Sequence, residues 1–348
     1  MLPIAVLDLR SALKSTAAKR ALYASGALDA WHRRRNRDRL TVIMFHRVLS
    51  PHDPRWASCD PEYTLSDTLF AACLDFFKRH YNVVALDDLL AARAGERPLP
   101  ERALLITFDD GWSDNEEFAL PQLRRTGVPA LLFVAGEAVG RSEPFWQEKL
   151  VHAWRAGRLD SARAARLWRD AGAGAAPPTF GGRDDLDGLR AVIAHIEGLP
   201  LERRAALVAG LGDAVADPTR YMATAEQLRT LAGSRVAIGA HGLTHNPLTE
   251  VDAGAELTKV RDLLGRHVTA APVLSFPHGR FDAGVIEKAR AAGYQLLFTS
   301  VPELPAAAGR GPGVFGRVGF TGETITEGGR FAPEKLALHL FRKPHASA

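Results

Sequence analysis

The stretch 103-ALLITFDDG-111 is an apolar run that ends in two adjacent carboxylates, Asp109 and Asp110, followed by a glycine. Its near-continuous apolar character is typical of a strand in a parallel sheet that is covered on both faces. Because successive side chains of a strand point to opposite sides, the two carboxylates are aimed differently where the strand ends. One can bind a metal ion while the other stays free as a base. The alternative is a strand-to-helix turn whose aspartates only cap the helix.

Further short apolar runs predict more strands of the same kind. They are 40-LTVIMF-45, 129-PALLFV-134, 235-RVAIGA-240, 272-PVLSF-276, 294-YQLLFTS-300 and 315-VFGRVGF-320. Helical spacings separate many of them, such as Val260, Leu263 and Leu264 before the run at 272. Strands that alternate with helices indicate βα units, and therefore an α/β barrel or a doubly wound sheet.

The chain of 348 residues is long enough for one such barrel with additions. We expect a basic helical segment at 1–39, the barrel at 40–320, and a C-terminal helix and tail at 321–348. Residues of about 141–230 break the strand rhythm, since they are rich in Ala, Arg and Leu at helical spacings. We therefore expect them to form a helical insertion in the barrel.

The N-terminal segment is basic, because residues 1–47 carry a net charge of +7 and leave −3 for the rest of the chain. One interpretation is a solvated face. The other is contact with an anionic membrane, since Leu2, Val6, Leu9 and Leu13 fall on one helical face among cations. No nucleic-acid-binding motif is present, so nucleic acid is not an expected partner.

The location of the protein is also an expectation from this segment. The N-terminus lacks the apolar core of a secretory signal, and no window of the sequence is apolar enough to span a bilayer. We expect a cytoplasmic protein, and the membrane contact would make it peripheral to the inner face of the membrane.

Two histidines follow the predicted strand 235–240 in the segment 241-HGLTH-245. At positions i and i+4 they would lie on one face of a helical turn, close enough to share one ion. Together with an aspartate from the TFDDG segment they predict an Asp-His-His set that leaves coordination positions open, as a catalytic metal site requires.

A third segment, 275-SFPHGRFD-282, follows another predicted strand. Pro277 and Gly279 predict a tight turn there. Such a turn can present a backbone N–H to a developing oxyanion, although an ordinary strand-ending loop would also contain Pro and Gly.

In this order, TFDDG, H-x-x-x-H and F-P-x-G-x-x-D resemble the polysaccharide deacetylases, carbohydrate esterase family 4, with exopolysaccharide-type members as the nearest layout. The resemblance covers residues of about 40–135 and 230–320. It implies a distorted (β/α)₇ barrel that holds one divalent ion, usually zinc.

The resemblance also implies roles for individual residues. Asp109 would be the general base, and Asp110, His241 and His245 would bind Zn²⁺ or another divalent transition metal. The backbone N–H of His278 would help to hold the oxyanion, and a protonated imidazole would deliver a proton to the leaving amine.

The sequence departs from the family pattern in two places. The family's arginine before the turn proline is absent, and we expect Arg317 to replace it, with a structural ion pair as the alternative. For the acid, His46 at the end of the first strand is preferred to His339 in the late motif 336-LALH-339. His278, which replaces the family's usual tyrosine, is a third candidate.

The expected activity is hydrolysis of a non-peptide carbon–nitrogen bond, the removal of N-acetyl groups from an amino sugar in an oligomer, a polymer or a lipid-linked precursor. The nearest alternative is a deformylase or amidase of a lipid-linked or small cyclic amide substrate. A non-catalytic sugar-binding protein is a further alternative, which the intact Asp-Asp-His-His set disfavours.

Overall fold

The computed structural model describes residues 15–174, 176–307 and 313–346 of the chain. The apolar face expected at Leu2, Val6, Leu9 and Leu13 lies outside these residues. Within them, seven parallel strands are hydrogen-bonded in the order β1-β5-β6-β7-β8-β9-β10, with the short β4 beside the start of β5. Their bounds are β1 (Leu40–Phe45), β4 (Asn82–Val83), β5 (Ala103–Phe108), β6 (Ala130–Val134), β7 (Val236–Ala240), β8 (Ala270–Ser275), β9 (Leu296–Phe298) and β10 (Val314–Phe315).

The sheet closes on itself through the residues after β10. The Val318 N–H donates to the Val42 carbonyl at 2.8 Å, and the Met44 N–H donates to the Val318 carbonyl at 3.0 Å. This closure confirms the expected distorted (β/α)₇ barrel. The last strand is shorter than the predicted 315–320, because its regular pairing stops at Gly316. A Cβ there would lie 2.5 Å from the carbonyl oxygen of Val301.

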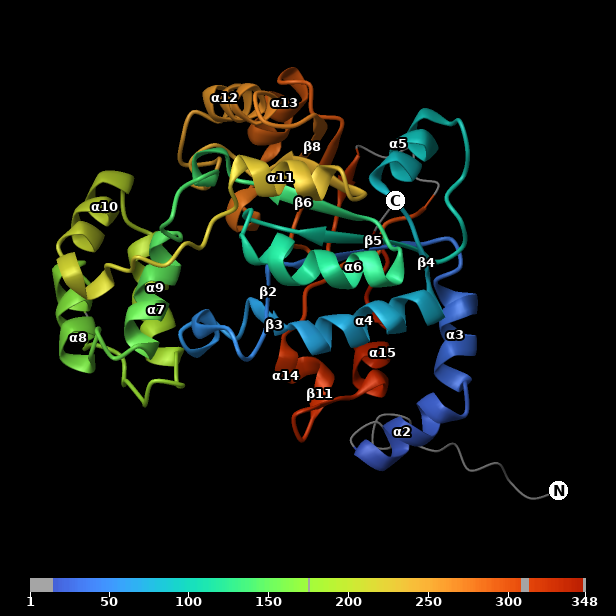
Figure 1. The fold of residues 1–348 in the computed structure, drawn as a ribbon, viewed down its shortest axis with the longest axis horizontal. Helices are drawn as coiled ribbons and strands as arrows, with labels where there is room; N and C mark the ends of the chain where they lie inside the picture. The colour runs from blue at the N-terminus through green and yellow to red at the C-terminus, as the bar shows by residue number, and fades with distance from the viewer. Residues whose placement is uncertain (1–14, 175, 308–312, 347–348) are drawn as a thin grey trace.

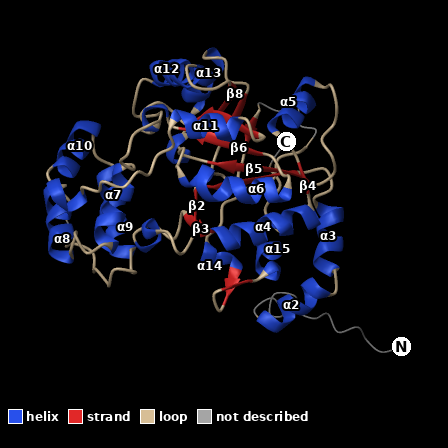
Figure 2. Cartoon of the chain, in the orientation of Figure 1, coloured by secondary structure: helices blue, strands red, loops and turns tan. Residues whose placement is uncertain are grey.

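Helices surround the barrel, as Figures 1 and 2 show. Serine, threonine and aspartate side chains cap several of them; Ser66, for example, accepts from the Leu69 N–H at the start of α4. The bounds are α4 (Asp67–His80), α5 (Leu86–Ala94), α6 (Leu120–Thr126), α11 (Ala225–Ala232), α12 (Ala253–Gly265) and α13 (Ala283–Ala291). Two small sheets lie beside the barrel: β2 (Arg47–Leu49) with β3 (Thr64–Ser66), and β11 (Thr326–Glu327) with β12 (Arg330–Phe331).

The strands alternate between two apolar clusters. Leu105 of β5 and Val42 of β1 belong to a cluster with Phe133, Phe298 and Phe315 that fills the barrel. The intervening side chains, such as those of Ile43 and Ile106, face the helices in a larger cluster. This period-2 alternation determines which residues at the strand ends point into the mouth of the barrel.

The helices α7 (Trp146–Arg155), α8 (Ser161–Asp170), α9 (Asp187–Glu197) and α10 (Leu201–Ala209) form a separate layer at one side of the barrel (Figure 1). They share an apolar cluster of their own, with Leu150, Trp154 and Ile196 among its buried members. Of the range expected for the insertion, about 141–230, the last residues belong to α11, which packs against β7.

The two ends of the described chain pack against each other. The helices α2 (Thr16–Ala24) and α3 (Ala27–Arg35) contact α15 (Pro333–Phe341), which follows the short α14 (Gly322–Ile325). Arg35 donates to the carbonyls of Phe341 and Lys343, so part of the basic segment stabilises this contact. Among the described residues, no helix combines the length and the apolar character that a bilayer crossing needs.

Candidate active site

The alternation of the strands brings the site together at the carboxyl ends of the barrel. In β1 the inward series Leu40, Val42 continues through Met44 to His46, and in β5 the series Leu105, Thr107 continues to Asp109. Counted in the same steps of two, the inward side also holds His241 just after β7, Ser275 at the end of β8 and Arg317 just after β10. Strand geometry thus brings Met44, His46, Asp109, His241 and Arg317 to one pocket, and the Ser275 hydroxyl contacts Asp109 and Arg317.

Asp110 leaves the strand through a sharp turn. Its φ is 79° and that of Gly111 is 89°, both in the left-handed region. A Cβ on Gly111 would lie 3.0 Å from Val134, so the turn requires glycine there. The indole N–H of Trp112 donates to Asp110 Oδ2 at 2.9 Å and fixes the carboxylate. The guanidinium of buried Arg47 lies over the face of this indole, 4.4 Å from its ring centre.

Asp110, His241 and His245 come together at this turn, with ligand atoms all within 4.8 Å of one another. The Nε2 atoms of His241 and His245 lie 3.4 and 3.2 Å from Asp110 Oδ1. The prediction of a shared helical turn for the two histidines was wrong. They lie in a loop, because Gly242 (φ 71°) and His245 (φ 63°) adopt left-handed backbone that no helix permits.

The surroundings of the three side chains suit a divalent transition metal. His241 Nδ1 lies 2.9 Å from the Ser275 carbonyl, to which it donates, so its Nε2 lone pair faces Asp110. The ring of Phe145 packs on His245 at a centroid distance of 3.9 Å and fixes its plane. Two imidazole nitrogens and one carboxylate oxygen are the donors of a catalytic zinc site with open positions.

Asp109 does not join this group but pairs with Arg317. The two guanidinium nitrogens of Arg317 lie 2.7 Å from the two carboxylate oxygens, and both side chains are almost fully buried. Arg317 Nη2 also donates to the Ser275 hydroxyl at 2.8 Å. A bidentate pair of this kind fixes the orientation of the carboxylate as well as its charge.

The electrostatics keep both aspartates ionised. Burial raises the pKa of Asp109, but Arg317 outweighs it, so that the pKa lies below its ordinary value. For Asp110 the contacts with His241 and His245 overcome burial and hold the pKa well below the usual range. The site therefore presents two carboxylates, one bound to an arginine and one facing two imidazoles.

The three candidate acids lie in different surroundings. His46 lines the pocket and contacts the Tyr63 ring edge-on at 5.0 Å, and its ring nitrogens make no hydrogen bond within the described residues. His278 Nε2 lies 3.0 Å from the His245 carbonyl, to which it donates, and burial, with His245, lowers the pKa of His278 to about 3. His339 lies on α15, where its Nε2 donates to the Gly319 carbonyl, and it does not line this pocket.

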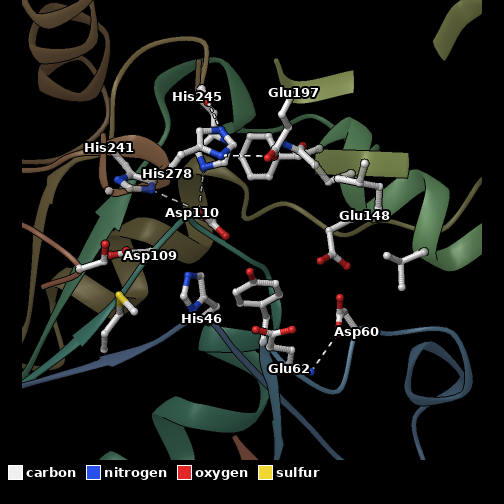
Figure 3. Close-up of a pocket in the computed structure, with 18 of the residues that line it drawn as sticks. His46, Asp60, Glu62, Asp109, Asp110, Glu148, Glu197, His241, His245 and His278 are labelled. Carbon is white, nitrogen blue, oxygen red and sulfur yellow. Dashed lines mark hydrogen bonds and ion pairs between the residues drawn. The ribbon is translucent and has the colours of Figure 1, made fainter. Parts of the chain in front are cut away.

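The pocket has a volume of about 560 Å³ and is bounded on one side by the helical layer. Figure 3 shows Glu197 and Glu148, from α9 and α7, on the far side of the pocket from Asp109 and His241. The pocket-lining residues of these two helices are Gln147, Glu148, Val151, Arg190, Ile193, Ala194 and Glu197.

Several residues of the site were not identified from the sequence. The strand alternation of 272-PVLSF-276 was a usable signal for Ser275, because Val273 lies in the cluster that fills the barrel and Ser275, two residues later, contacts Arg317 and Asp109. For Tyr63 and Glu197 no such signal exists. They reach the pocket from the loop before β3 (Thr64–Ser66) and from α9, whose positions depend on tertiary packing.

Comparison with known proteins finds similarity to the polysaccharide deacetylases. A family model described as polysaccharide deacetylase matches residues 96–172. YxkH of Bacillus subtilis (strain 168), named as a putative polysaccharide deacetylase, is 24% identical over 123 residues, which is 35% of this chain and 41% of that protein. The matched region thus spans less than half of this relative's length.

Solved structures share the fold over most of the chain. The Streptococcus pyogenes deacetylase PplD, solved in complex with acetate, has a TM-score of 0.54 at 14% identity and covers 87% of this chain and 99% of its own. IcaB from Ammonifex degensii has a TM-score of 0.55 at 18% identity, with coverages of 87% and 97%. At these identities the likeness is one of fold.

Proposed function

We propose that the chain, which is similar to the polysaccharide deacetylases over residues 96–172 and shares their fold, is a metal-dependent hydrolase that removes N-acetyl groups from an amino sugar. The substrate is an oligomer, a polymer or a lipid-linked precursor. The observation that carries the proposal is the convergence of two sets in one pocket: Asp109 with Arg317, and Asp110 with His241 and His245.

We assign the metal ion to Asp110, His241 and His245, and zinc is the proposed ion. The donor set also suits other divalent transition metals, whose availability shares in the choice. When bound, the ion supplies Lewis acidity, which polarises the acyl carbonyl and lowers the pKa of a water molecule. The indole of Trp112 and the carbonyl of Ser275 orient two of the three ligands.

Asp109 is the proposed general base. Its lowered pKa keeps it ionised at neutral pH. Oδ2 accepts from both Arg317 and the Ser275 hydroxyl, whereas Oδ1 keeps a second acceptor position beside its bond to Arg317. It accepts a proton from the water that attacks the acyl carbon. Arg317 holds the carboxylate in one orientation throughout, so no reorganisation is needed at that moment.

His46 is the proposed acid that protonates the leaving nitrogen. It approaches the pocket from β1, a different side from the metal ligands, and its ring nitrogens are not occupied by protein partners among the described residues (Figure 3). The Nε2 of His278 is occupied by a carbonyl, so we assign its side chain to holding the loop of His245. The His278 backbone N–H remains the proposed donor to the oxyanion.

The cytoplasmic location and the membrane contact are further parts of the proposal. Arg33 and Arg34 are exposed on α3, and Trp31 beside them is 42% exposed, a composition that suits the surface of an anionic membrane. Sedimentation of the full chain with anionic lipid vesicles at low salt tests this contact; recovery of all the protein in the supernatant would contradict it.

Product analysis tests the reaction. Purified protein, loaded with zinc, is incubated with N-acetylglucosamine oligomers, with an N-formylated hexosamine and with a cyclic ureide, and acetate, formate and ring-opened product are quantified. We expect acetate together with an equal amount of free amine. Formate or ring-opened product without acetate would instead support the deformylase or cyclic amidase alternative.

A further inference from the structure

Tyr63 presents an exposed aromatic ring to the pocket. Its exposed fraction is 45%, and Trp31 and Val301, the other large apolar side chains exposed among the described residues, do not line this pocket. Its hydroxyl makes no hydrogen bond within the described part of the chain, and its ring contacts that of His46 edge-on at 5.0 Å. Neither core packing nor a structural hydrogen bond explains this position.

The segment that carries Tyr63 is held from both sides. Its carbonyl accepts from the Arg47 N–H at 3.0 Å, at the start of β2, which follows β1 of the barrel. From the other side, Arg190 of α9 pairs with Asp60 at 2.7 Å and with Glu62 at 3.0 Å. The ring therefore belongs to a braced segment between the barrel and the helical layer, and a braced ring loses little conformational entropy on binding.

Carboxylates lie beside this ring. Figure 3 shows Asp60, Glu62 and Glu148 gathered on the side of His46 away from His241. Burial raises the pKa of Asp60, and the nearby charge of Glu148 adds to this effect. A pyranose ring has an apolar C–H face and an edge of hydroxyls, so an aromatic face flanked by carboxylate acceptors matches it.

The charges of the pocket exclude an anionic occupant of this region. Each of the three arginines that line the pocket is paired with a carboxylate: Arg190 as above, Arg317 with Asp109, and Arg280 with Glu250. No lysine lines the pocket among the described residues. A neutral or cationic sugar is accepted here, whereas a phosphate would face carboxylates with no lysine and no unpaired arginine beside it among the described pocket residues.

We propose that Tyr63, with Glu62 and Glu148, forms a second sugar subsite beside the point of deacetylation. The inference rests on the proposed function and narrows its substrate to an oligomer or polymer of an amino sugar. The ring of Tyr63 stacks on the C–H face of the neighbouring residue, and the two carboxylates accept its hydroxyl or ammonium protons.

Binding and turnover together test the subsite. In an Asp109→Asn background, which binds without turnover, calorimetry with the N-acetylglucosamine trisaccharide compares the native Tyr63 with Tyr63→Ala, Tyr63→Phe and Tyr63→Trp. Because an aromatic contact contributes about 0.5–1.5 kcal/mol, we expect Tyr63→Ala to weaken binding by about two- to twelvefold. The aromatic variants stay within about twofold of the parent, as does Trp31→Ala, a matched exposed aromatic outside the pocket.

With the native Asp109, the same Tyr63→Ala change raises KM for the trisaccharide by more than it changes the kinetics on the monosaccharide, as expected for a contact with the neighbouring sugar. Equal trisaccharide affinities of the parent and the Tyr63→Ala variant, or no binding by the parent, overturn the subsite. Binding that depends on Tyr63 without any acetate release supports the subsite and overturns the deacetylase assignment, so the two failures are distinguishable.

Discussion

Arg317 holds both carboxylate oxygens of Asp109, a residue 208 positions earlier in the chain, at 2.7 Å each. The two side chains meet because the residues after β10 close the barrel against β1, which pairs with β5, the strand that Asp109 follows. The Ser275 hydroxyl accepts from the same guanidinium. This contact supports our proposal that Arg317, from another strand, takes the place of the arginine that the family pattern carries before the turn proline.

This pair predicts a large effect of Arg317→Met. The change leaves Asp109 as a buried charge without a partner, which costs about 3–5 kcal/mol in the free energy of unfolding. The pKa of Asp109 rises as well, so kcat falls. Urea denaturation measures the first effect. The double variant Arg317→Met, Asp109→Leu regains stability but not activity; unchanged stability of the single variant would contradict the buried pair.

The indole of Trp112 predicts a change in metal affinity. Trp112→Phe removes the donor to Asp110 Oδ2 and keeps the ring, so zinc affinity falls by about 10- to 100-fold. Competition with a chromophoric chelator measures it. Trp154→Phe is the matched control, since Trp154 is buried in the helical layer and its indole N–H has no hydrogen-bond partner among the described residues. Equal losses in both variants would indicate a general packing defect.

The assignment of His46 as the acid predicts that substitutions of His46 and His339 have different effects on kcat. His46→Gln lowers kcat by about 10²- to 10⁴-fold and leaves zinc binding unchanged, because the side chain donates a proton but does not bind the ion. His339→Gln, on α15 outside the pocket, keeps kcat within about twofold. Steady-state kinetics and zinc titration of both variants test this assignment. A large loss of kcat in His339→Gln, with kcat kept in His46→Gln, would show that His339 is the acid instead.

His32 predicts a pH dependence of stability that is separate from the site. It is fully buried, its Nδ1 accepts from the Asn36 amide, and its ring stacks on Phe341 at 3.9 Å. Burial, with the charge of Arg102, lowers the pKa of His32 to about 3. Below about pH 6.5, His32 binds a proton in the unfolded chain but not in the folded state. The free energy of unfolding therefore falls as the pH falls from about 6.5 toward 3.

The expected slope from this one group is up to about 1.4 kcal/mol per pH unit. Urea midpoints at pH 7 and pH 5 show it, and in His32→Phe this part of the dependence is absent. His52→Phe, at an exposed position, retains the parent slope. The same slope in parent and His32→Phe proteins would show that another group titrates.

Much of the site follows from strand alternation, which is visible in the sequence. His46, Asp109 and Arg317 all continue the inward series of their strands, and this is why they meet at the barrel mouth. The loop of His241 and His245 could not be read in the same way. Its i, i+4 spacing also fits a helix, and only the left-handed backbone at Gly242 and His245 decides against it.

The side of the pocket that the helical layer forms could not be predicted from the sequence, for a different reason. Arg190 meets Asp60 across 130 positions, and the packing of the helical layer against the barrel, not any local pattern, sets that contact. Local signals determine elements and their faces, whereas contacts between distant elements depend on the whole packing arrangement.

The most direct test of the central claim compares Asp109→Asn with Asp110→Asn, two isosteric changes at adjacent positions, for zinc content and for acetate release from an N-acetylglucosamine oligomer. The assigned roles predict that Asp109→Asn binds one zinc per chain without turnover, while Asp110→Asn loses zinc and turnover together. Chelator abolishes acetate release by the parent, and added zinc restores it. Acetate release that persists in the Asp109→Asn protein, or zinc lost from it and kept by Asp110→Asn, would contradict the account.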